Sequence, residues 1–405
     1  MLRDVKWPRM PHDEYHRRID KAKELLTKHK MDAVLLFSPT SWFYYGGWTD
    51  VAQMHNDVWR SAMILCQDRD PVVVAHTAFQ SCLTLTSHIE EARYWNSESR
   101  KRYPRSFLRL FLDTIRDLRL DDKVLGIEAG PDIDTYLSFT QYDKLRAALP
   151  AATLVGADKV IFEQRMIKTP YEVAIIREGC KRACATVKTA FAAIRPGVNE
   201  LEVHHVFWRA AVENGLVEAP YHATWLCFSS NAREAGGVAR WITQPVDRVI
   251  EVGDHGICDC GPTYKGYQLD FQRDFFVGDP PDKEIKYYSI AKEAFLETIA
   301  AVRPGVRMCD IHEVSVQALR KRDRRQRHMI SFVGHQEGLA NHEPPWITAD
   351  EEEVVQPGMV MAIEVGAFDP DNEVCGGMPE DVLVVTEDGA ENLTGDLSHD
   401  LWIVR

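Results

Sequence analysis

The first third of the chain alternates short apolar runs with amphipathic stretches. Residues 16–29 carry apolar side chains at nearly helical spacing, and the apolar run 32–38 that follows has the length of a buried strand. The same patterns predict three more strands and one more helix: strands at 61–66, 71–75 and 123–128, and a helix at 103–120. Because strands and helices alternate, we expect residues 1–158 to form an α/β domain.

A long amphipathic helix is predicted near the start of a second domain, which we place at residues 159–405. Its pattern of apolar positions spans 172–194. Thr169 stands where the helix N-cap is expected, and Pro170 follows at the first helical position, where proline is favoured.

The second domain repeats part of its own sequence. Ala-Ala-Ile-Arg-Pro-Gly-Val at 192–198 recurs as Ala-Ala-Val-Arg-Pro-Gly-Val at 300–306, and each copy separates two predicted helices. Asn199 and Asp310 are the expected N-caps of the helices that follow. Two copies, each too long for a solenoid repeat, predict an α+β domain with two-fold pseudosymmetry, with helices outside and a curved sheet inside.

A second match within the repeat places acidic residues at equivalent positions. The pattern of 253–261 recurs at 358–366, so that Asp259 corresponds to Glu364. Each acid lies in an apolar strand, where an unpaired charge costs several kcal/mol.

A second acid follows each of these residues across a predicted turn. Asp270 comes 11 residues after Asp259, and Glu380 comes 16 residues after Glu364. Two hairpins related by the pseudo-two-fold axis would bring all four carboxylates together. Such carboxylates cannot all remain ionised unless cations balance them, so the sequence predicts a site for divalent metal ions.

A histidine strengthens the case for metal ions. His335 lies in Gly334-His335-Gln336, seven residues before His342. Carboxylates with one imidazole suit a pair of Mn²⁺, Zn²⁺, Co²⁺ or Fe²⁺ ions. Two such ions that share a water produce a hydroxide near neutral pH and polarise a carbonyl, which favours metal-assisted hydrolysis.

Composition narrows the class of protein. The 405 residues are 45% hydrophobic and 27% charged, with a net charge of −13 that gives no support to nucleic-acid binding. No apolar run approaches the 18 residues of a membrane span. Nine cysteines without a CxxC pair, and a polar N-terminal segment, predict a cytoplasmic protein with reduced thiols.

These residues resemble the pita-bread metallopeptidase family, which includes methionine aminopeptidase, aminopeptidase P, prolidase and the metal-free creatinase. The motifs that carry the resemblance are Asp259 and Asp270, Gly334-His335, His342-Glu343-Pro344, Pro357-Gly358-Met359-Val360 before Glu364, and Glu380-Asp381. The two-domain branch is most similar, because 165–172 resembles its domain-entry motif and 13–48 its N-terminal domain. The resemblance implies a creatinase-like α/β domain followed by a catalytic pita-bread domain.

The resemblance also implies roles for individual residues. Two divalent ions would be held by Asp259, Asp270, His335, Glu364 and Glu380. Asp259 would chelate one ion, Asp270 and Glu380 would bridge both, and His335 and Glu364 would hold the second. Glu364 would also accept the proton of a bridging water whose hydroxide attacks an amide carbonyl, and His342 would hydrogen-bond the substrate or the developing oxyanion. The implied activity is that of an Xaa-Pro aminopeptidase or prolidase acting on a short peptide.

Some substrate-handling positions depart from the family pattern. No histidine occurs between His222 and His255, where the peptidases usually place one, and Gly376-Gly-Met-Pro replaces their usual Gly-x-Arg-x. An additional carboxylate, Glu337, stands beside the metal histidine. Two alternatives therefore stay open: a hydrolase or lyase of a small molecule, such as a dimethylsulfoniopropionate lyase or a small-amide hydrolase, and a catalytically silent binding protein.

Several residues are candidates for substrate contacts: Trp42, Tyr44, His55, Arg60, His222, Arg240 and Trp241. In the two-domain relatives the segment that matches 42–48 reaches the active site of a neighbouring subunit, so the resemblance implies a homodimer. The alternative for 42–48 is a strand and turn that fill the N-terminal core.

Overall fold

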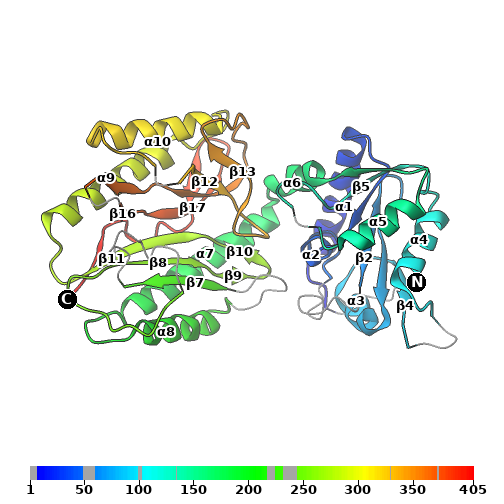
Figure 1. Cartoon of the computed structure of the whole chain (residues 1–405), viewed down its shortest axis with the longest axis horizontal. Coiled ribbons are helices and arrows are strands. Elements are labelled where there is room, and N and C mark those ends of the chain that lie inside the picture. Colours follow the sequence, from blue (N-terminus) through cyan, green and yellow to red (C-terminus); the bar gives the residue numbers. More distant parts are fainter. Residues whose placement is uncertain are drawn as a thin grey trace. The chain divides into compact units, whose positions relative to one another are not determined.

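A computed structural model describes the chain at residues 7–48, 60–98, 103–133, 135–216, 224–230, 244–328, 330–371 and 374–405. The chain forms two compact units, Met1–Arg165 and Met166–Arg405 (Figure 1), and each is described on its own. The predicted domain boundary, after residue 158, falls at the start of helix α6 (Asp158–Met166). Gln164 of this helix donates a hydrogen bond to the carbonyl of Arg18, so most of α6 packs with the N-terminal unit.

The N-terminal unit is built around one six-stranded sheet of order β4-β3-β2-β1-β5-β6. Pairs β1–β2 and β2–β3 are antiparallel, whereas β3–β4, β1–β5 and β5–β6 are parallel. The strands are β1 (Ala33–Leu36), β2 (Ala62–Cys66), β3 (Val72–His76), β4 (Glu91–Trp95), β5 (Val124–Ile127) and β6 (Thr153–Gly156). The three central strands, β1, β2 and β3, are buried at every position, which explains why their sequences read as continuous apolar runs.

The helices of this unit follow the predicted α/β alternation. They are α1 (His12–Lys28), α2 (Pro39–Gly46), the 3₁₀ turn η2 (Thr77–Phe79), α3 (Gln80–Thr86), α4 (Phe107–Asp117), α5 (Phe139–Ala148) and α6. The segment 42–48, for which a strand and turn was the alternative interpretation, is instead mostly helical. Ser38 caps α2 by accepting a hydrogen bond from the backbone N–H of Ser41, Pro39 begins the helix, and Gly47 ends it at φ 65°.

The C-terminal unit contains a mixed sheet of order β19-β11-β8-β7 and an antiparallel sheet of order β13-β12-β14-β17-β18, with two short hairpins, β9–β10 and β15–β16. The strands of the first sheet are β7 (Trp225–Ser229), β8 (His255–Gly261), β11 (Phe271–Val277) and β19 (Trp402–Val404), of which β19 runs parallel to β11. Those of the second are β12 (Phe332–Gln336), β13 (Glu343–Thr348), β14 (Val360–Glu364), β17 (Glu380–Val385) and β18 (Ala390–Asn392). The hairpin strands are β9 (Thr263–Tyr264), β10 (Tyr267–Gln268), β15 (Ala367–Asp369) and β16 (Val374–Gly377).

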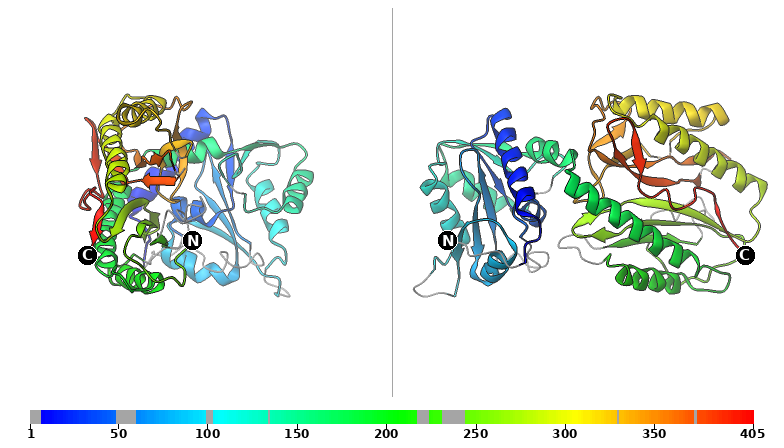
Figure 2. Two further views of the ribbon diagram at one scale, coloured as in Figure 1. Left: turned by 60° about the vertical axis from the view of Figure 1, so that its left-hand side comes forward. Right: turned by 180° about the vertical axis from the view of Figure 1, so that it is seen from behind.

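Four long helices cover the outer side of this unit. They are α7 (Pro170–Phe191), α8 (Glu200–Glu213), α9 (Asp282–Ala301) and α10 (Met308–Arg322). The views of Figures 1 and 2 show α9 and α10 over the sheet that contains β12, and α7 and α8 beside the sheet that contains β8. Helices outside and strands inside confirm the predicted α+β architecture.

The two halves of this unit repeat each other in detail. Gly197 and Gly305, the glycines of the repeated heptapeptide, both have φ 86°, which glycine adopts without strain. Isolated backbone bridges join Asn199 to Val249 in the first half and Arg307 to Val354 in the second. The predicted duplication of a helix-helix-strand unit is therefore confirmed at the level of single backbone contacts.

The predicted helix starts are confirmed in two cases and wrong in one. Thr169 and Glu172 form a capping box around Pro170, and Asn199 caps α8. Asp310 is not an N-cap, because α10 already begins at Met308, directly after the bridged Arg307. Asp310 lies in the first turn, where its negative charge complements the helix dipole and pairs with Arg307.

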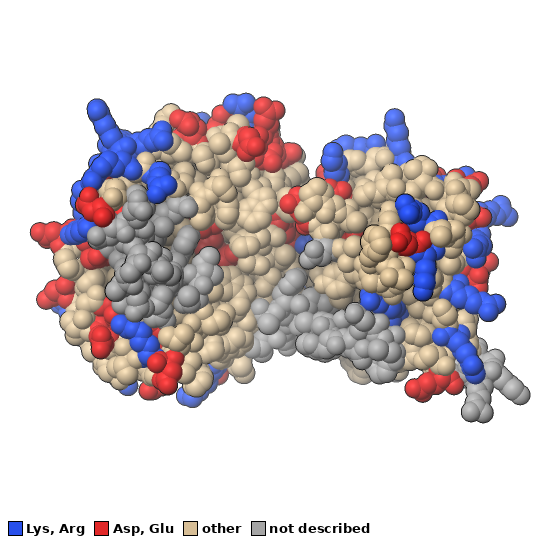
Figure 3. Space-filling view, viewed as in Figure 1, with Lys and Arg blue, Asp and Glu red and all other residues tan. Residues whose placement is uncertain are grey.

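The surface mixes charges of both signs. On the face drawn in Figure 3, basic side chains gather over the end of α10, whose last turn holds Arg320, Lys321 and Arg322. Arg322 pairs with Glu293 and Glu297 of α9, so this run is balanced by acids. Within the described residues, none of the helices is long and apolar enough to cross a bilayer.

Candidate metal centre

The first half of the C-terminal unit contributes two aspartates through a hairpin. Asp259 lies on β8 and is paired with Gln272 of β11, and Asp270 directly precedes β11. The β9–β10 hairpin between them reverses the chain at Lys265 and Gly266, both of which have positive φ. The predicted turn is therefore confirmed, and it brings the two aspartates to one end of the sheet.

The second half contributes two glutamates and a histidine. Glu364 of β14 lies directly opposite Glu380 of β17, although the β15–β16 hairpin separates them in sequence. His335 of β12 is paired with Ala362 of β14. Because side chains two residues apart on a strand share a face, Glu364 lies on the same face as His335.

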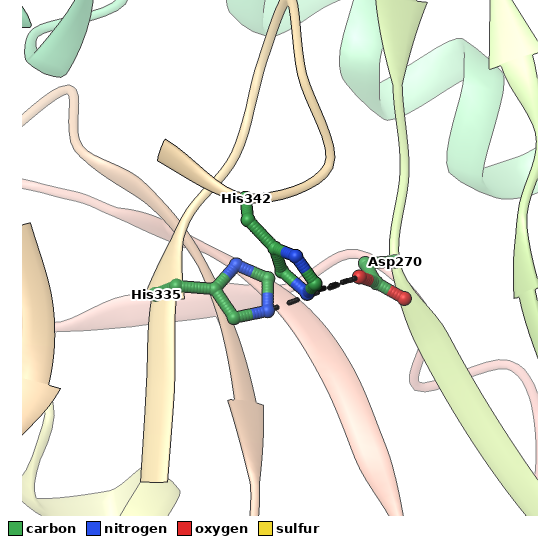
Figure 4. A group of neighbouring side chains, drawn as sticks. All are labelled: Asp270, His335 and His342. Carbon is green, nitrogen blue, oxygen red and sulfur yellow. Dashed lines mark ion pairs between the residues drawn. The ribbon is translucent and has the colours of Figure 1, made fainter. Parts of the chain in front are cut away.

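All five side chains meet in one cluster, which we call the candidate centre. Nε2 of His335 lies 3.8 Å from Oδ2 of Asp270, 3.8 Å from Oε1 of Glu364 and 3.9 Å from Oε1 of Glu380. Figure 4 shows His335 and Asp270 pointing toward each other from separate strands, beside His342. Three sets of ligand atoms lie within 4.8 Å of one another. They are those of His335, Glu364 and Glu380, those of Asp259, Asp270 and Glu380, and those of Asp270, His335 and His342.

The candidate centre has an excess of negative charge. Burial and the neighbouring carboxylates raise the pKa of Asp259 to about 7 and that of Glu364 to about 8. The same causes raise the pKa of Asp270 and Glu380 well above the usual range. Among the described residues, none of the four carboxylates pairs with a lysine or arginine. The imidazole of His335 lies near Asp270, Glu364 and Glu380, and that of His342 lies near Asp270.

The donor atoms fit divalent ions. Nε2 of His335 and Oδ1 of Asp259 are buried and have no hydrogen-bond partner within the described part of the chain, which is costly unless another group binds them. Nδ1 of His335 lies 3.0 Å from the carbonyl oxygen of Gln336, an arrangement that leaves Nε2 as the lone-pair nitrogen that a metal requires. Oxygen ligands with one imidazole match the chemistry of Mn²⁺, Zn²⁺, Co²⁺ or Fe²⁺.

His342 lies at the open side of the candidate centre. Its side chain is 46% exposed, and its Nε2 lies 3.5 Å from Oδ2 of Asp270. Its ring stands edge-on to the ring of His335, with centroids 4.3 Å apart. The adjacent Glu343 is buried and accepts the backbone N–H groups of Leu339 and Ala340, which holds the turn that carries His342.

A buried arginine joins the two halves directly behind the candidate centre. Arg273 of β11 donates a hydrogen bond to the carbonyl oxygen of Glu380 at 2.6 Å and pairs with Asp381 at 2.6 Å. Although burial raises it, the charges of Arg273 and His399 hold the pKa of Asp381 at about 2. Arg273 therefore links β11, the strand of the first half that follows Asp270, to β17, the strand of the second half that carries Glu380.

Two residues near the candidate centre were not predicted from sequence. Trp346 is paired with His335 across β12 and β13, and its ring lies 5.3 Å from that of His342 and 4.8 Å from that of Phe332. Asn341 donates a weak hydrogen bond, 3.5 Å long, to Oδ2 of Asp270. The sequence could have indicated Trp346 only through its position, four residues after the candidate His342.

Glu337, noted in the sequence as an additional carboxylate, is fully buried. Burial raises its pKa well above the usual range, against the opposing positive charge of Lys168. An ionised Glu337 in turn raises the pKa of Asp270, so the two carboxyl groups disfavour each other's charged form.

The predicted substrate-contact residues are divided between the N-terminal unit and undescribed segments. Trp42 and Tyr44 are buried in the N-terminal unit, where Trp42 stacks on Trp48 and Tyr44 lies under the guanidinium of Arg18. Arg60 belongs to the same unit and donates a hydrogen bond to the carbonyl of Tyr136. Four others lie outside the described residues: His55, His222, Arg240 and Trp241. The contacts of Trp42 and Tyr44 are those of the core-packing alternative.

Removing metal ions is expected to reverse the pH dependence of stability. Asp259 and Glu364 have raised pKa values in the metal-free fold, so the fold holds protons that the unfolded chain releases. The free energy of unfolding of metal-free protein should therefore fall as pH rises from about 5 to about 8, by on the order of 1 kcal/mol per pH unit for each group. Urea unfolding with EDTA or with Mn²⁺ measures this.

The control for this prediction is Glu364→Gln, which removes one titrating group and should flatten the slope of the metal-free protein. With Mn²⁺ the carboxylates stay ionised and bound, so added metal should stabilise the protein more at high pH than at low pH. A metal-free wild type whose stability is constant or rises across this range would contradict the assignment.

Comparison with known proteins supports the arrangement described above. Residues 174–387 match the model of metallopeptidase family M24, and residues 18–167 match the creatinase/prolidase N-terminal domain. An Xaa-Pro dipeptidase of Pyrococcus furiosus is 26% identical over 377 residues, which cover 93% of this chain and 97% of that one. A creatinase of a Bacillus species is 25% identical over 399 residues, which cover 96% and 92%.

Solved structures show the same fold. The prolidase from Pyrococcus horikoshii superposes with a TM-score of 0.76 at 22% identity, covering 93% of this chain and 98% of that one. A dipeptidase from Mycobacterium ulcerans superposes with a TM-score of 0.79 at 22% identity, covering 98% and 99%. Because the M24 model matches more than half of the residues, the chain belongs to metallopeptidase family M24 and is a metal-dependent hydrolase.

Proposed function

We propose that the protein hydrolyses the amide bond before proline in short Xaa-Pro peptides, with two divalent metal ions as cofactors. The observation that carries the proposal is the buried meeting of five ligand-type side chains from both halves of the C-terminal unit. The similarity to an Xaa-Pro dipeptidase over nearly its whole length supports the choice of substrate.

The five residues of the candidate centre would be the metal ligands in this reaction. Asp259, Asp270 and Glu380 would hold one ion, and His335, Glu364 and Glu380 the other, with Asp270 between them. When bound, the ions would lower the pKa of a water and polarise the scissile carbonyl.

Two side chains are proposed to act on the substrate and the water. Glu364 is the proposed general base, which takes a proton from the attacking water and returns it to the departing nitrogen. His342, exposed beside Asp270, is proposed to donate a hydrogen bond to the carbonyl oxygen, where negative charge develops.

The test is hydrolysis of Xaa-Pro dipeptides and Xaa-Pro-Xaa tripeptides after loading with Mn²⁺, Zn²⁺, Co²⁺ or Fe²⁺. Release of the Xaa residue that EDTA abolishes is the expected result. Failure to cleave any of them while two ions are bound would refute peptidase activity. Turnover of dimethylsulfoniopropionate or a small amide, without cleavage of the peptides, would support the small-molecule alternative. A purified protein that binds no metal ions would support the alternative of a catalytically silent binding protein.

Trp346 is expected to contribute to substrate binding. With His342 and Phe332 it forms a half-buried aromatic surface on the same face as His335. Aromatic surfaces of this kind bind apolar groups, and truncation removes on the order of 1.5–3 kcal/mol of contact. We expect Trp346→Ala to raise KM for Xaa-Pro substrates by about tenfold or more, with little change in kcat or metal content.

The matched control is Trp402→Ala, which removes an exposed tryptophan from β19 of the other sheet. It should leave KM unchanged, and Trp346→Phe should lie between wild type and Trp346→Ala. Equal KM values for Trp346→Ala and Trp402→Ala would show that the substrate does not reach this surface.

The homodimer and the cytoplasmic location remain predictions from the sequence.

A further inference from the structure

Three histidines gather at the start of α1, in the N-terminal unit and apart from the candidate centre. His12 and His16 lie one helical turn apart, and both are exposed. Their Nε2 atoms are 3.1 Å apart, and their ring centroids are 4.3 Å apart. The ring of His88, from the segment between α3 and β4, lies with its centroid 5.3 Å from that of His12.

The spacing of the two helical histidines suits a chelated metal ion. Two histidines at positions i and i+4 present their rings on one face of a helix, which is how helical metal sites bind zinc. Nitrogen ligands bind Zn²⁺ at about 2.0–2.1 Å, so two nitrogens on one ion lie about 2.9–3.4 Å apart for bond angles between square and tetrahedral. The observed separation of 3.1 Å falls within this range.

His88 is oriented as metal-binding histidines usually are. Its Nε2 lies 2.9 Å from the carbonyl oxygen of Met10, which can only accept a hydrogen bond. The proton is therefore on Nε2, and Nδ1 carries the lone pair. A backbone carbonyl that binds one ring nitrogen and leaves the other for metal is a recurrent feature of metal sites.

We propose that His12 and His16 chelate a divalent transition-metal ion, and that the ring of His88 moves toward this ion to become the third imidazole ligand. In the metal-free fold no nitrogen of His88 lies within 4.8 Å of ligand nitrogens of both other histidines, so this movement accompanies binding. Imidazole nitrogens favour Cu²⁺, Ni²⁺ and Zn²⁺, in contrast to the oxygen-rich candidate centre. The positive end of the α1 dipole opposes a cation here by about 0.3–1 kcal/mol, and the exposed Asp13 in the same turn offsets part of this charge. The ion joins the start of α1 to the segment before β4, so its binding should raise the thermal stability of the protein.

Nickel binding by full-length, tag-free protein tests this proposal. His12→Ala and His16→Ala should each bind one Ni²⁺ fewer than wild type in equilibrium dialysis and elute earlier from a nickel-chelate column. His205→Ala is the matched control, because His205 is also an exposed histidine on a helix, α8. The candidate centre is the same in all four proteins, so the difference in stoichiometry isolates the proposed site.

Two further measurements complete the test. His88→Ala should bind this Ni²⁺ at least about tenfold more weakly and lose the increase in melting temperature that Ni²⁺ gives wild type. If His12→Ala and His16→Ala bind as much Ni²⁺ as His205→Ala, the two rings are only hydrogen-bonded to each other and the proposal is overturned. An unchanged affinity in His88→Ala would overturn the role of His88 as the third ligand.

Discussion

Replacing Asp270 with alanine is expected to empty the candidate centre and abolish hydrolysis. Oδ2 of Asp270 lies 3.8 Å from Nε2 of His335, and Asp270 also belongs to the set of ligand atoms with Asp259 and Glu380. Because this one carboxylate serves both prospective ions, its loss weakens each. We expect kcat/KM to fall by a factor on the order of a thousand or more, and metal content to fall below one ion per chain.

The fold should survive this change. Asp270 is a buried carboxylate among like charges and pairs with no lysine or arginine among the described residues. Its removal from the metal-free protein therefore relieves repulsion. Asp279→Ala is the control, because Asp279 is exposed in the turn after β11. Metal analysis and hydrolysis rates check the prediction, and two ions per chain in Asp270→Ala would exclude a bridging role.

The architecture of the C-terminal unit could be predicted from sequence because the duplication is visible there. The repeated heptapeptides mark equivalent turns, and the repeated glycine-acid-glycine pattern marks equivalent strands with Asp259 and Glu364. Strand pairing then determines which side chains meet, since Glu364 and Glu380 lie directly opposite each other. The five residues of the candidate centre follow from these few local features.

Other features depend on tertiary context that the sequence does not display. The aromatic residues at 42–45 have high strand propensity, yet Ser38 and Pro39 start a helix, because Ser38 is held by buried Glu128, 90 residues away. Trp346 faces His335 only because register shifts occur between β12 and β13, and alternation along one strand cannot reveal a bulge.

The second large effect is expected for Arg273, which was not singled out from sequence. Arg273→Met takes the guanidinium away from buried Asp381, which keeps only His399 as a basic partner among the described residues. It also removes the hydrogen bonds that Arg273 donates to the carbonyls of Glu380, Leu397 and Ser398. Removing one partner of a buried ion pair costs about 3–5 kcal/mol. We expect the free energy of unfolding to fall by that amount and metal affinity to fall with it, because Glu380 is no longer held in place.

The comparison that isolates this effect is Arg177→Met. Arg177 also pairs with a carboxylate through two hydrogen bonds, to Glu391, but its side chain is 48% exposed, and such pairs contribute about 0–1 kcal/mol. Arg273→Lys should be intermediate, because lysine keeps the charge but cannot reach as many acceptors as the guanidinium. Urea unfolding and metal titration measure both quantities. Two results would each contradict the prediction: that Arg273→Met is no less stable than Arg177→Met, or that it binds metal ions as tightly as Arg177→Met does. Either result would show that Arg273 does not couple the two halves to the candidate centre.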